Sequence, residues 1–413
     1  MFDVNFVRSL FPAFTDSPGS EWAFFENAGG SYVPASVIER LADFYRHSKV
    51  QPYGPAPMQV AAGQAMDAGR QALADLLGVA VDRLTIGPST TQNLNTLAAA
   101  CAPLLAVGDE IIVTEQDHEA NIGCWERLCQ QRHAVLRVWP VDPHSGELEI
   151  ADLDGLLGER TRIVAVTHSS NIIGTVNPIA EIAERVHAAG ALLVVDGVSF
   201  APHHWPDIDA TGADVYAFSL YKTFATHLGA MVCTPQVLER IAPQCHWFNA
   251  ERPWSRLDAA GPDHASIAAL TGLAEYFDAL YAQHFGEPGE KTAAERAQAV
   301  AYEAHRFEAM QCAPLLDFLS RKQVRLLGRD HMRNREANLS LIPLEGTAAA
   351  LAEGLATRQI AVRSGHFYAA RLLKAVGVAD IKDGVMRISF AHYNTAQEVA
   401  RLIETLDELL PNR

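Results

Sequence analysis

Short apolar runs alternate with helical patterns of apolar residues along the chain as far as Cys233. Because this alternation allows right-handed crossovers between neighbouring parallel strands, it predicts a mostly parallel, mixed sheet between layers of helices. The runs that have the length of buried strands lie at residues 111–113, 134–139, 162–167, 192–195 and 215–218.

Beyond Cys233 the pattern changes, first to an aromatic, loop-rich segment (247–262) and then to a helical pattern (266–281). A polar break that contains glycine and proline precedes a helical pattern from Ala294 to about Met310, and short strand-like runs follow. The final helix is marked by the capping box Thr395-x-x-Glu398. We expect an N-terminal helical segment (1–21) that packs with the small domain, a large domain (22–283) and a small C-terminal α/β domain (284–413).

Composition excludes several classes of protein. The formal net charge of -16 opposes binding to a phosphate backbone, and no apolar run approaches membrane-spanning length. The six cysteines form no Cys-x-x-Cys pair and no zinc-type pattern. We therefore expect no nucleic-acid partner, no membrane association, no metal site, and reduced thiols in the cytoplasm.

Polar residues follow two of the predicted strands. Asp196 follows the run at 192–195, while Ser219 and Lys222 follow the run at 215–218. Each residue alone is more often a helix cap, a turn former or a solvated side chain. In an open α/β sheet, however, ligands bind at the carboxyl ends of the strands. A lysine there can form a Schiff base and a carboxylate can keep a pyridine nitrogen protonated, so the combination predicts pyridoxal 5'-phosphate.

Further polar residues are expected at the same edge of the sheet. The Ser89–Gln92 turn precedes a helix, where free N–H groups favour a phosphate, although an N-cap accounts for one of its hydroxyls. His118 either stacks on a cofactor ring or is a surface turn residue. Asn171 either contacts a ring oxygen or only forms a turn. The small residues after Asn27 allow the backbone to approach a ligand closely.

The string Tyr221-Lys222-Thr-Phe-Ala-Thr-His227-Leu-Gly229 resembles a motif of the class V aminotransferase group of fold-type I pyridoxal-phosphate enzymes. Within that group the chain is similar to the cysteine desulfurase-like proteins, and it resembles a subfamily with a YKxxGPHLG-like string that lacks the desulfurase cysteine. The resemblance implies a homodimer in which the loop at 252–266 completes the partner's site. The roles that it implies are a Schiff-base lysine (Lys222), a ring-nitrogen partner (Asp196), a ring-stacking histidine (His118), a ring-oxygen contact (Asn171), phosphate ligands (Thr91, Gln92, Ser219) and a carboxylate-binding arginine (Arg387).

The chain also departs from the desulfurase pattern. Desulfurases carry their sulfur-accepting cysteine in the loop Arg-x-Gly-His-His-Cys, which here reads Arg363-Ser-Gly365-His366-Phe367-Tyr368. Ser199 stands where desulfurases have a cofactor-binding glutamine, and Tyr221 where they have a histidine. Ala260-Gly261-Pro262 replaces the Gly-Thr-Pro that reaches the partner's phosphate. Because tyrosine cannot accept a persulfide, we do not expect desulfuration by the thiol route.

The expected function is that of a pyridoxal-phosphate enzyme acting at Cα or Cβ of an amino acid, with β-elimination ahead of transamination. Epimerisation or racemisation, and a non-catalytic cofactor-binding role, remain alternatives. Lys222 and His118 are the expected catalytic residues together with Tyr368, which either protonates a leaving group or only fills a lid. The substrate-binding candidates are Arg387, Asn27, Arg363 and Tyr368.

Overall fold

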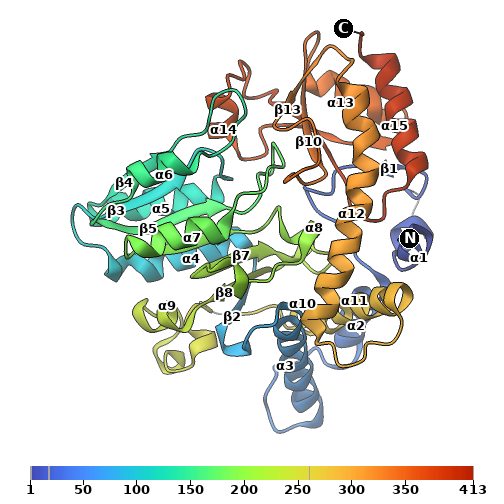
Figure 1. Ribbon diagram of the computed structural model, residues 1–413. Coiled ribbons are helices and arrows are strands. Elements are labelled where there is room, and N and C mark those ends of the chain that lie inside the picture. Colours follow the sequence, from blue (N-terminus) through green and yellow to red (C-terminus); the bar gives the residue numbers. More distant parts are fainter. Residues whose placement is uncertain (1, 17–18, 260, 413) are drawn as a thin grey trace.

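A computed structural model describes residues 2–16, 19–259 and 261–412 of the chain. Its larger part contains the strands β2 (Leu84–Gly87), β3 (Glu110–Thr114), β4 (Val135–Trp139), β5 (Thr161–Thr167), β6 (Leu192–Asp196), β7 (Val215–Ser219) and β8 (Gly229–Cys233). They form one sheet in the order β2-β8-β7-β6-β5-β3-β4 (Figure 1). Strands β3 to β7 are parallel, whereas β8 is antiparallel to both of its neighbours. The prediction of a mostly parallel, mixed sheet is confirmed.

Apolar residues cover both faces of this sheet. On β6, Leu193 and Val195 belong to one buried cluster, while Leu192 and Val194 belong to another. Helices pack on both clusters, which explains why these strands are apolar throughout and do not alternate with polar residues. The helices of this part are α2 (Ala35–His47), α3 (Pro57–Leu77), α4 (Thr90–Cys101), α5 (Ala120–Arg132), α6 (Ile150–Leu156), α7 (Ile179–Ala188), α8 (Ala201–His204), α9 (Pro235–Arg240), α10 (His264–Ala268) and α11 (Leu270–Phe285).

A smaller sheet lies in the C-terminal part. Its strands are β9 (Val324–Leu327), β10 (Asn338–Pro343), β12 (Arg363–Gly365) and β13 (Val385–Ser389), which are antiparallel in the order β12-β13-β10-β9. The helices here are α13 (Ala348–Ala356), α14 (Ala370–Ala375) and α15 (Ala396–Leu409). The long helix α12 (Ala293–Leu319) runs past both parts, in contact with α3, α8 and α15 (Figure 1).

The strand that opens the chain joins the small domain. β1 (Ala23–Phe24) pairs in parallel with β11 (Ile360–Ala361). The expected boundary at residue 22 would place β1 with the large sheet. The strand instead pairs with β11 of the C-terminal part.

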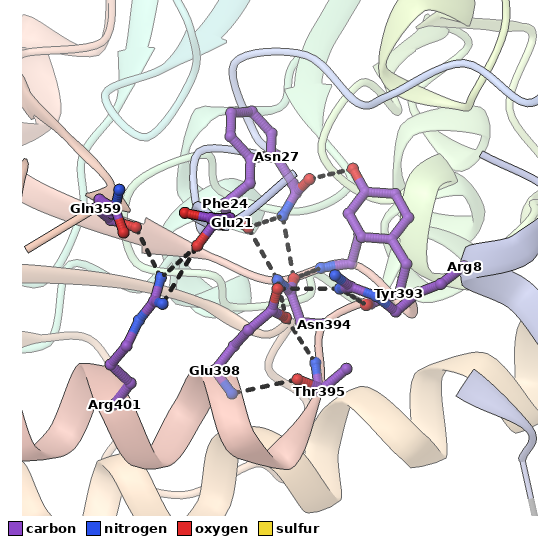
Figure 2. Close-up of polar contacts among 11 residues, drawn as sticks. Arg8, Glu21, Phe24, Asn27, Gln359, Tyr393, Asn394, Thr395, Glu398 and Arg401 are labelled. Atoms are coloured by element: carbon purple, nitrogen blue, oxygen red, sulfur yellow. Dashed lines mark hydrogen bonds and ion pairs between the residues drawn. The ribbon is translucent and has the colours of Figure 1, made fainter. Parts of the chain in front are cut away.

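The N-terminal helix α1 (Val4–Ser9) contacts both parts of the molecule. Arg8 donates to the backbone oxygen of Tyr393 and pairs with Glu398 of α15, each at 3.0 Å (Figure 2). The backbone N–H of Asp3 donates to His284 of α11 at 2.9 Å. In the described part of the chain, no helix is both long and apolar enough to cross a membrane.

Candidate active site

The residues singled out from the sequence lie at the carboxyl ends of neighbouring strands. Asp196 is the last residue of β6, and Lys222 ends the single turn η5 (Leu220–Lys222) directly after β7. His118 and Asn171 lie in the segments that follow β3 and β5. Because β3, β5, β6 and β7 are adjacent in the sheet, these side chains meet in one crevice.

Two adjoining cavities occupy this crevice, and both are lined by His118, Asn171, Tyr221 and Lys222. The inner cavity, of about 60 Å³, is also lined by Thr90, Thr91, Ala120, Thr167, Asp196, Val198, Ser199 and Ser219. The outer cavity, of about 450 Å³, is also lined by Glu26, Ala28, Gly29, Arg363, Ser364, Gly365, His366, Phe367, Tyr368, Lys382 and Arg387.

Hydroxyl groups gather at the end of the inner cavity, beside the N-terminus of α4. The hydroxyls of Thr90 and Ser219 are 2.8 Å apart, and Thr91 also lines the cavity. Ser89 acts as the helix cap, because its hydroxyl accepts from the backbone N–H of Gln92 at 3.1 Å. Hydroxyls beside a helix N-terminus suit a phosphate group.

Gln92 is the predicted phosphate ligand that does not line the inner cavity. Its side chain is exposed, and its backbone N–H is bound by Ser89. Thr90, which was part of the predicted turn, lies in the cavity wall instead. The reason is the helical rotation at the start of α4, which turns Thr90 inward and Gln92 toward solvent.

Burial sets the charge state of Asp196 and Lys222. It raises the pKa of the Asp196 carboxyl to about 6, while the backbone N–H of Val198, at 2.9 Å, favours the charged form. Burial, followed by the positive charge of Arg387, lowers the pKa of the Lys222 amine from 10.5 to about 8. A lysine that loses its proton readily beside a carboxylate fits a pyridine aldehyde: Lys222 would bind the aldehyde carbon and Asp196 the ring nitrogen.

His118 is neutral in this site. Burial, then the positive charges of Lys222 and Arg387, lower its pKa to about 4. Its Nδ1 accepts from the backbone N–H of Ala120 at 3.1 Å, so the ring proton lies on Nε2. A neutral, flat ring in the wall of both cavities suits stacking on a planar cofactor better than a charged ring does.

Asn171 connects the inner cavity to the loop around Phe367. Its amide nitrogen donates to the backbone oxygen of Phe367 at 2.9 Å, and its own backbone oxygen accepts from Arg387 at 3.3 Å. The amide nitrogen carries two N–H groups, so one holds Phe367 and the other is left to donate to a ring oxygen.

Arg387 of β13 is buried, with 3% of its surface exposed. Its Nη2 pairs with Glu26 at 3.3 Å, and the guanidinium carbon lies 3.8 Å from the ring centre of Phe367. Its Nε has no hydrogen-bond partner. Glu26 and Phe367 thus hold the guanidinium from two sides, and N–H donors remain unused. Binding of a substrate carboxylate requires such donors.

The loop that carries Phe367 and Tyr368 has an unusual backbone. Both residues have positive φ, 46° and 57°, which non-glycine residues adopt only when the surroundings enforce it. The backbone oxygen of Tyr368 accepts from the N–H of Glu119 at 2.7 Å, and its ring centre lies 5.2 Å from that of His118. These contacts place Tyr368, 66% exposed, at the mouth of the outer cavity.

The remaining predicted residues are placed differently. Arg363 is exposed and lines the outer cavity, and Ser199 lines the inner one. Asn27 lines neither. Its amide nitrogen donates to the backbone oxygen of Ser389 at 2.8 Å, and its oxygen accepts from Tyr393, so its polar atoms hold the chain in place (Figure 2). Ala260, of the predicted partner-facing tripeptide, lies outside the described residues.

Sequence reasoning missed Glu26 and Phe367, the two residues that hold Arg387. Glu26 follows the apolar run at 22–25, so the rule that identified Asp196, an acid directly after a strand, would also have identified Glu26. Phe367 carries no comparable signal, because its position over Arg387 depends on the backbone of the loop.

Comparisons with known proteins agree with this geometry. The family model of class V aminotransferases matches residues 23–402. The chain is 32% identical to the aminotransferase-like protein FGM3 of Gibberella zeae, over 99% of both chains. It is 31% identical to a cysteine desulfurase of Cronobacter sakazakii, over 98% of both chains. Among solved structures, the cysteine desulfurase CsdA of Escherichia coli matches at 25% identity over 100% of both chains, with a TM-score of 0.82.

Proposed function

The chain belongs to the class V aminotransferase family of pyridoxal-phosphate-dependent enzymes, and we propose that it is a lyase that performs β-elimination on an amino acid. The bound cofactor supplies an electron sink that acidifies the Cα–H bond of the amino acid. One observation carries the proposal: Lys222, Arg387 and Tyr368 line the same cavity. Among the described residues, no cysteine lines that cavity.

Each of the three residues has a chemical role at this cavity. Arg387 binds the carboxylate of the substrate and so fixes the direction of the Cα–H bond. Lys222 removes the Cα proton, for which its pKa of about 8 is well suited near neutral pH. The Tyr368 hydroxyl donates a proton to the group that leaves from Cβ.

The cysteines support elimination over desulfuration through a protein persulfide. Five of the six are buried, and the sixth, Cys245, is only partly exposed. Cys312, the nearest in sequence to the desulfurase position, lies in the core of the small domain, where burial raises its pKa to about 12. A thiol that stays protonated is a poor sulfur acceptor.

Transamination is the second candidate, favoured by the printed name of the aminotransferase-like relative. Transamination uses the same groups as β-elimination up to removal of the Cα proton. It then differs in the atom to which Lys222 returns that proton. Epimerisation would need a second acid on the opposite face of Cα. A protein that only binds the cofactor would not need Lys222, Asp196 and Arg387 together in one crevice.

The first experiment tests the cofactor site. Borohydride reduction of the holoenzyme followed by peptide mass spectrometry should find the cofactor on Lys222, and Lys222→Ala should carry none. A label on another lysine would overturn the assignment of the site.

A substrate panel tests the reaction. We expect a keto acid and ammonia from a β-substituted amino acid with no keto-acid acceptor present, and no persulfide on any of the six cysteines. Turnover that requires an added keto acid would instead establish transamination.

Tyr368→Phe should slow elimination without weakening cofactor binding. Equal rates in wild type and Tyr368→Phe would show that the Tyr368 hydroxyl takes no part in elimination and that the side chain only fills a lid.

We also propose a homodimer whose 252–266 loop reaches the partner's site. Trp247 and Phe248, beside this loop, are 85% and 63% exposed, which is unusual for large apolar side chains. Light scattering should give twice the chain mass, and a double substitution of both residues by serine should shift the population toward monomer. A fully active wild-type monomer would contradict the proposal.

We further propose that the protein works in the cytoplasm. All six cysteines are free in the structure, including Cys124 and Cys129, which lie close together in the sequence on α5. Unpaired thiols are typical of reducing compartments. Thiol titration of the denatured protein after isolation from its host should give six reactive groups.

A further inference from the structure

A cluster of histidines and glutamates lies where three separate elements meet, and its Glu336 lines a cavity that Lys222 also lines. His204 ends α8, His305 lies on α12, and Glu336 precedes β10. Glu336 is 1% exposed, whereas the side chains of His204 and His305 are 28% and 19% exposed. The carboxylate is thus buried beneath two imidazoles that reach solvent, which leaves an entry path for an ion.

The distances within this cluster do not fit ordinary hydrogen bonds. His204 Nε2 lies 3.3 Å from one oxygen of Glu336, and His305 Nδ1 lies 3.5 Å from the other. Charge-assisted hydrogen bonds are shorter, about 2.7–2.9 Å. Both carboxylate oxygens and His305 Nδ1 are buried atoms without a hydrogen-bond partner.

The same distances fit the edges of a coordination polyhedron. A tetrahedral zinc site with bonds of about 2.0–2.1 Å places its ligand atoms about 3.3 Å apart. The separation of His204 Nε2 from Glu336 Oε1, 3.3 Å, has that value, while His305 Nδ1 lies 3.5 Å from the other oxygen, Oε2. With one ligand atom taken from each residue, the three atoms all lie within 4.8 Å of one another. The rings of His204 and His305 lie with their centres 4.0 Å apart and their planes 35° apart, so both rings would rotate to direct their nitrogens at one ion.

We propose that His204, His305 and Glu336 bind one divalent transition-metal ion of the zinc type. Two imidazoles and a carboxylate are ligands that Zn²⁺ prefers, and a fourth position is left for water. The expectation of no metal site was drawn from the cysteines, whereas the ligands proposed here are histidine and glutamate from segments far apart in the sequence.

Neighbouring groups hold the ligands in orientation. The ring of Phe200 stacks on His204, with ring centres 4.5 Å apart and planes 12° apart. The adjacent His203 is bound to the buried Glu308 of α12 at 2.6 Å, which fixes α8 against α12. The backbone N–H of Glu336 donates to Gly174 O at 2.8 Å. Such second contacts restrict the rotation of ligands and strengthen metal binding.

The metal would act by joining the two domains. Its ligands come from the helix that follows the Asp196 strand, from the long helix α12, and from the entry to the small sheet. The ion would therefore fix the small domain, with Arg387 and Tyr368, relative to Lys222. It is a structural role, so the ion itself touches no substrate.

Metal titration of the holoenzyme tests the proposal. After treatment with a chelator, calorimetry with Zn²⁺ should show one site per chain, and Co²⁺ should give the visible d–d absorption of a tetrahedral nitrogen and oxygen site. Glu336→Gln and His305→Asn should each weaken Zn²⁺ binding by roughly 100-fold or more, because even loss of a second-shell contact costs 10- to 100-fold.

His187→Asn is the matched control, because His187 also faces a carboxylate, that of Asp214 at 2.9 Å, but on the surface. It should bind Zn²⁺ as the wild type does. If Glu336→Gln fails to fold, His305→Asn decides the test, since His305 lies nearer the surface. Wild type without a stoichiometric site, or variants with wild-type affinity, would overturn the proposal and leave the cluster as ion pairs alone.

Discussion

At the scale of single residues, the chemistry of the site depends on what surrounds each charged group. Lys222 is an ordinary lysine by type, yet burial and Arg387 lower its pKa to about 8. Arg387 in turn is positioned by Glu26 and Phe367, which come from opposite ends of the chain. Reactivity therefore follows from the crevice as much as from the residue types.

Arg387→Ala should weaken binding of amino-acid substrates. It removes the group assigned to the substrate carboxylate and leaves Glu26 without its partner, so the loss should be about 2 to 5 kcal/mol in apparent affinity. Steady-state kinetics measure it as a rise in KM. Arg363→Ala is the comparison, because Arg363 is the other candidate arginine in the same cavity but is exposed, and its loss should have a much smaller effect. Equal effects of both variants would show that Arg387 does not bind the carboxylate.

The rate of cofactor capture by the apoenzyme should depend on pH through Lys222. Only the neutral amine attacks an aldehyde, and the lowered pKa means that the neutral form predominates above about 8. The rate should therefore rise roughly tenfold per pH unit below that value and then level off. Stopped-flow absorbance measures this profile. A rate that still rises steeply above pH 9 would indicate a lysine with an ordinary pKa.

At the scale of secondary-structure elements, two segments that share the capping-box pattern behave differently. The capping box at Thr395 is present, because its hydroxyl accepts from Glu398 N at 3.2 Å and Glu398 accepts from Thr395 N at 2.8 Å. The similar pattern Ser36-x-x-Glu39 is not used as a cap. Helix α2 begins at Ala35, and the Ser36 hydroxyl donates to Gly272 O at 2.8 Å.

Helix α12 also differs from its pattern, since it continues beyond Met310 through Pro314 to Leu319. Leu315, Leu316 and Leu319 are buried in the core of the small domain. Packing of these side chains stabilises the last turns, which outweighs the hydrogen bond lost at the proline.

Thr395→Ala should destabilise the protein by about 1 kcal/mol, because it removes one half of a capping box. A lower thermal midpoint would measure the effect, which should be confined to stability because α15 lies outside the cavities. Thr395→Ser keeps the hydroxyl and should retain wild-type stability. If the alanine variant matched the serine variant, the cap would contribute nothing.

At the scale of the whole molecule, the cavities lie between the part that holds the seven-stranded sheet and the part that holds the four-stranded sheet. Lys222 and Asp196 come from the large domain, while Arg387 and Tyr368 come from the small one. An ion pair also joins the domains: Arg329 binds Glu147 through two contacts, at 2.5 and 3.0 Å. Arg329 lowers the pKa of the Glu147 carboxyl below its ordinary value.

Glu147→Gln should reduce stability at neutral pH by about 1 to 2 kcal/mol, between the values for surface and buried ion pairs. Because the folded-state pKa is lowered, the contribution is present above about pH 4.5 and is lost as the pH falls through that lowered value. The difference in thermal midpoint between wild type and variant should thus shrink in acid. Glu149→Gln, at an exposed position, should show neither effect.

The sequence by itself determined the sheet, the strand ends and the polar residues on them that we propose bind the cofactor. Apolar runs of strand length must be buried, and polar residues directly after parallel strands must share one edge, so Asp196 and Lys222 could be located without coordinates. Only the tertiary structure decided which groups from distant segments complete the site. The pairing of Glu26 with Arg387, the placement of Phe367, and the convergence of His204, His305 and Glu336 depend on domain packing, which local sequence patterns do not encode.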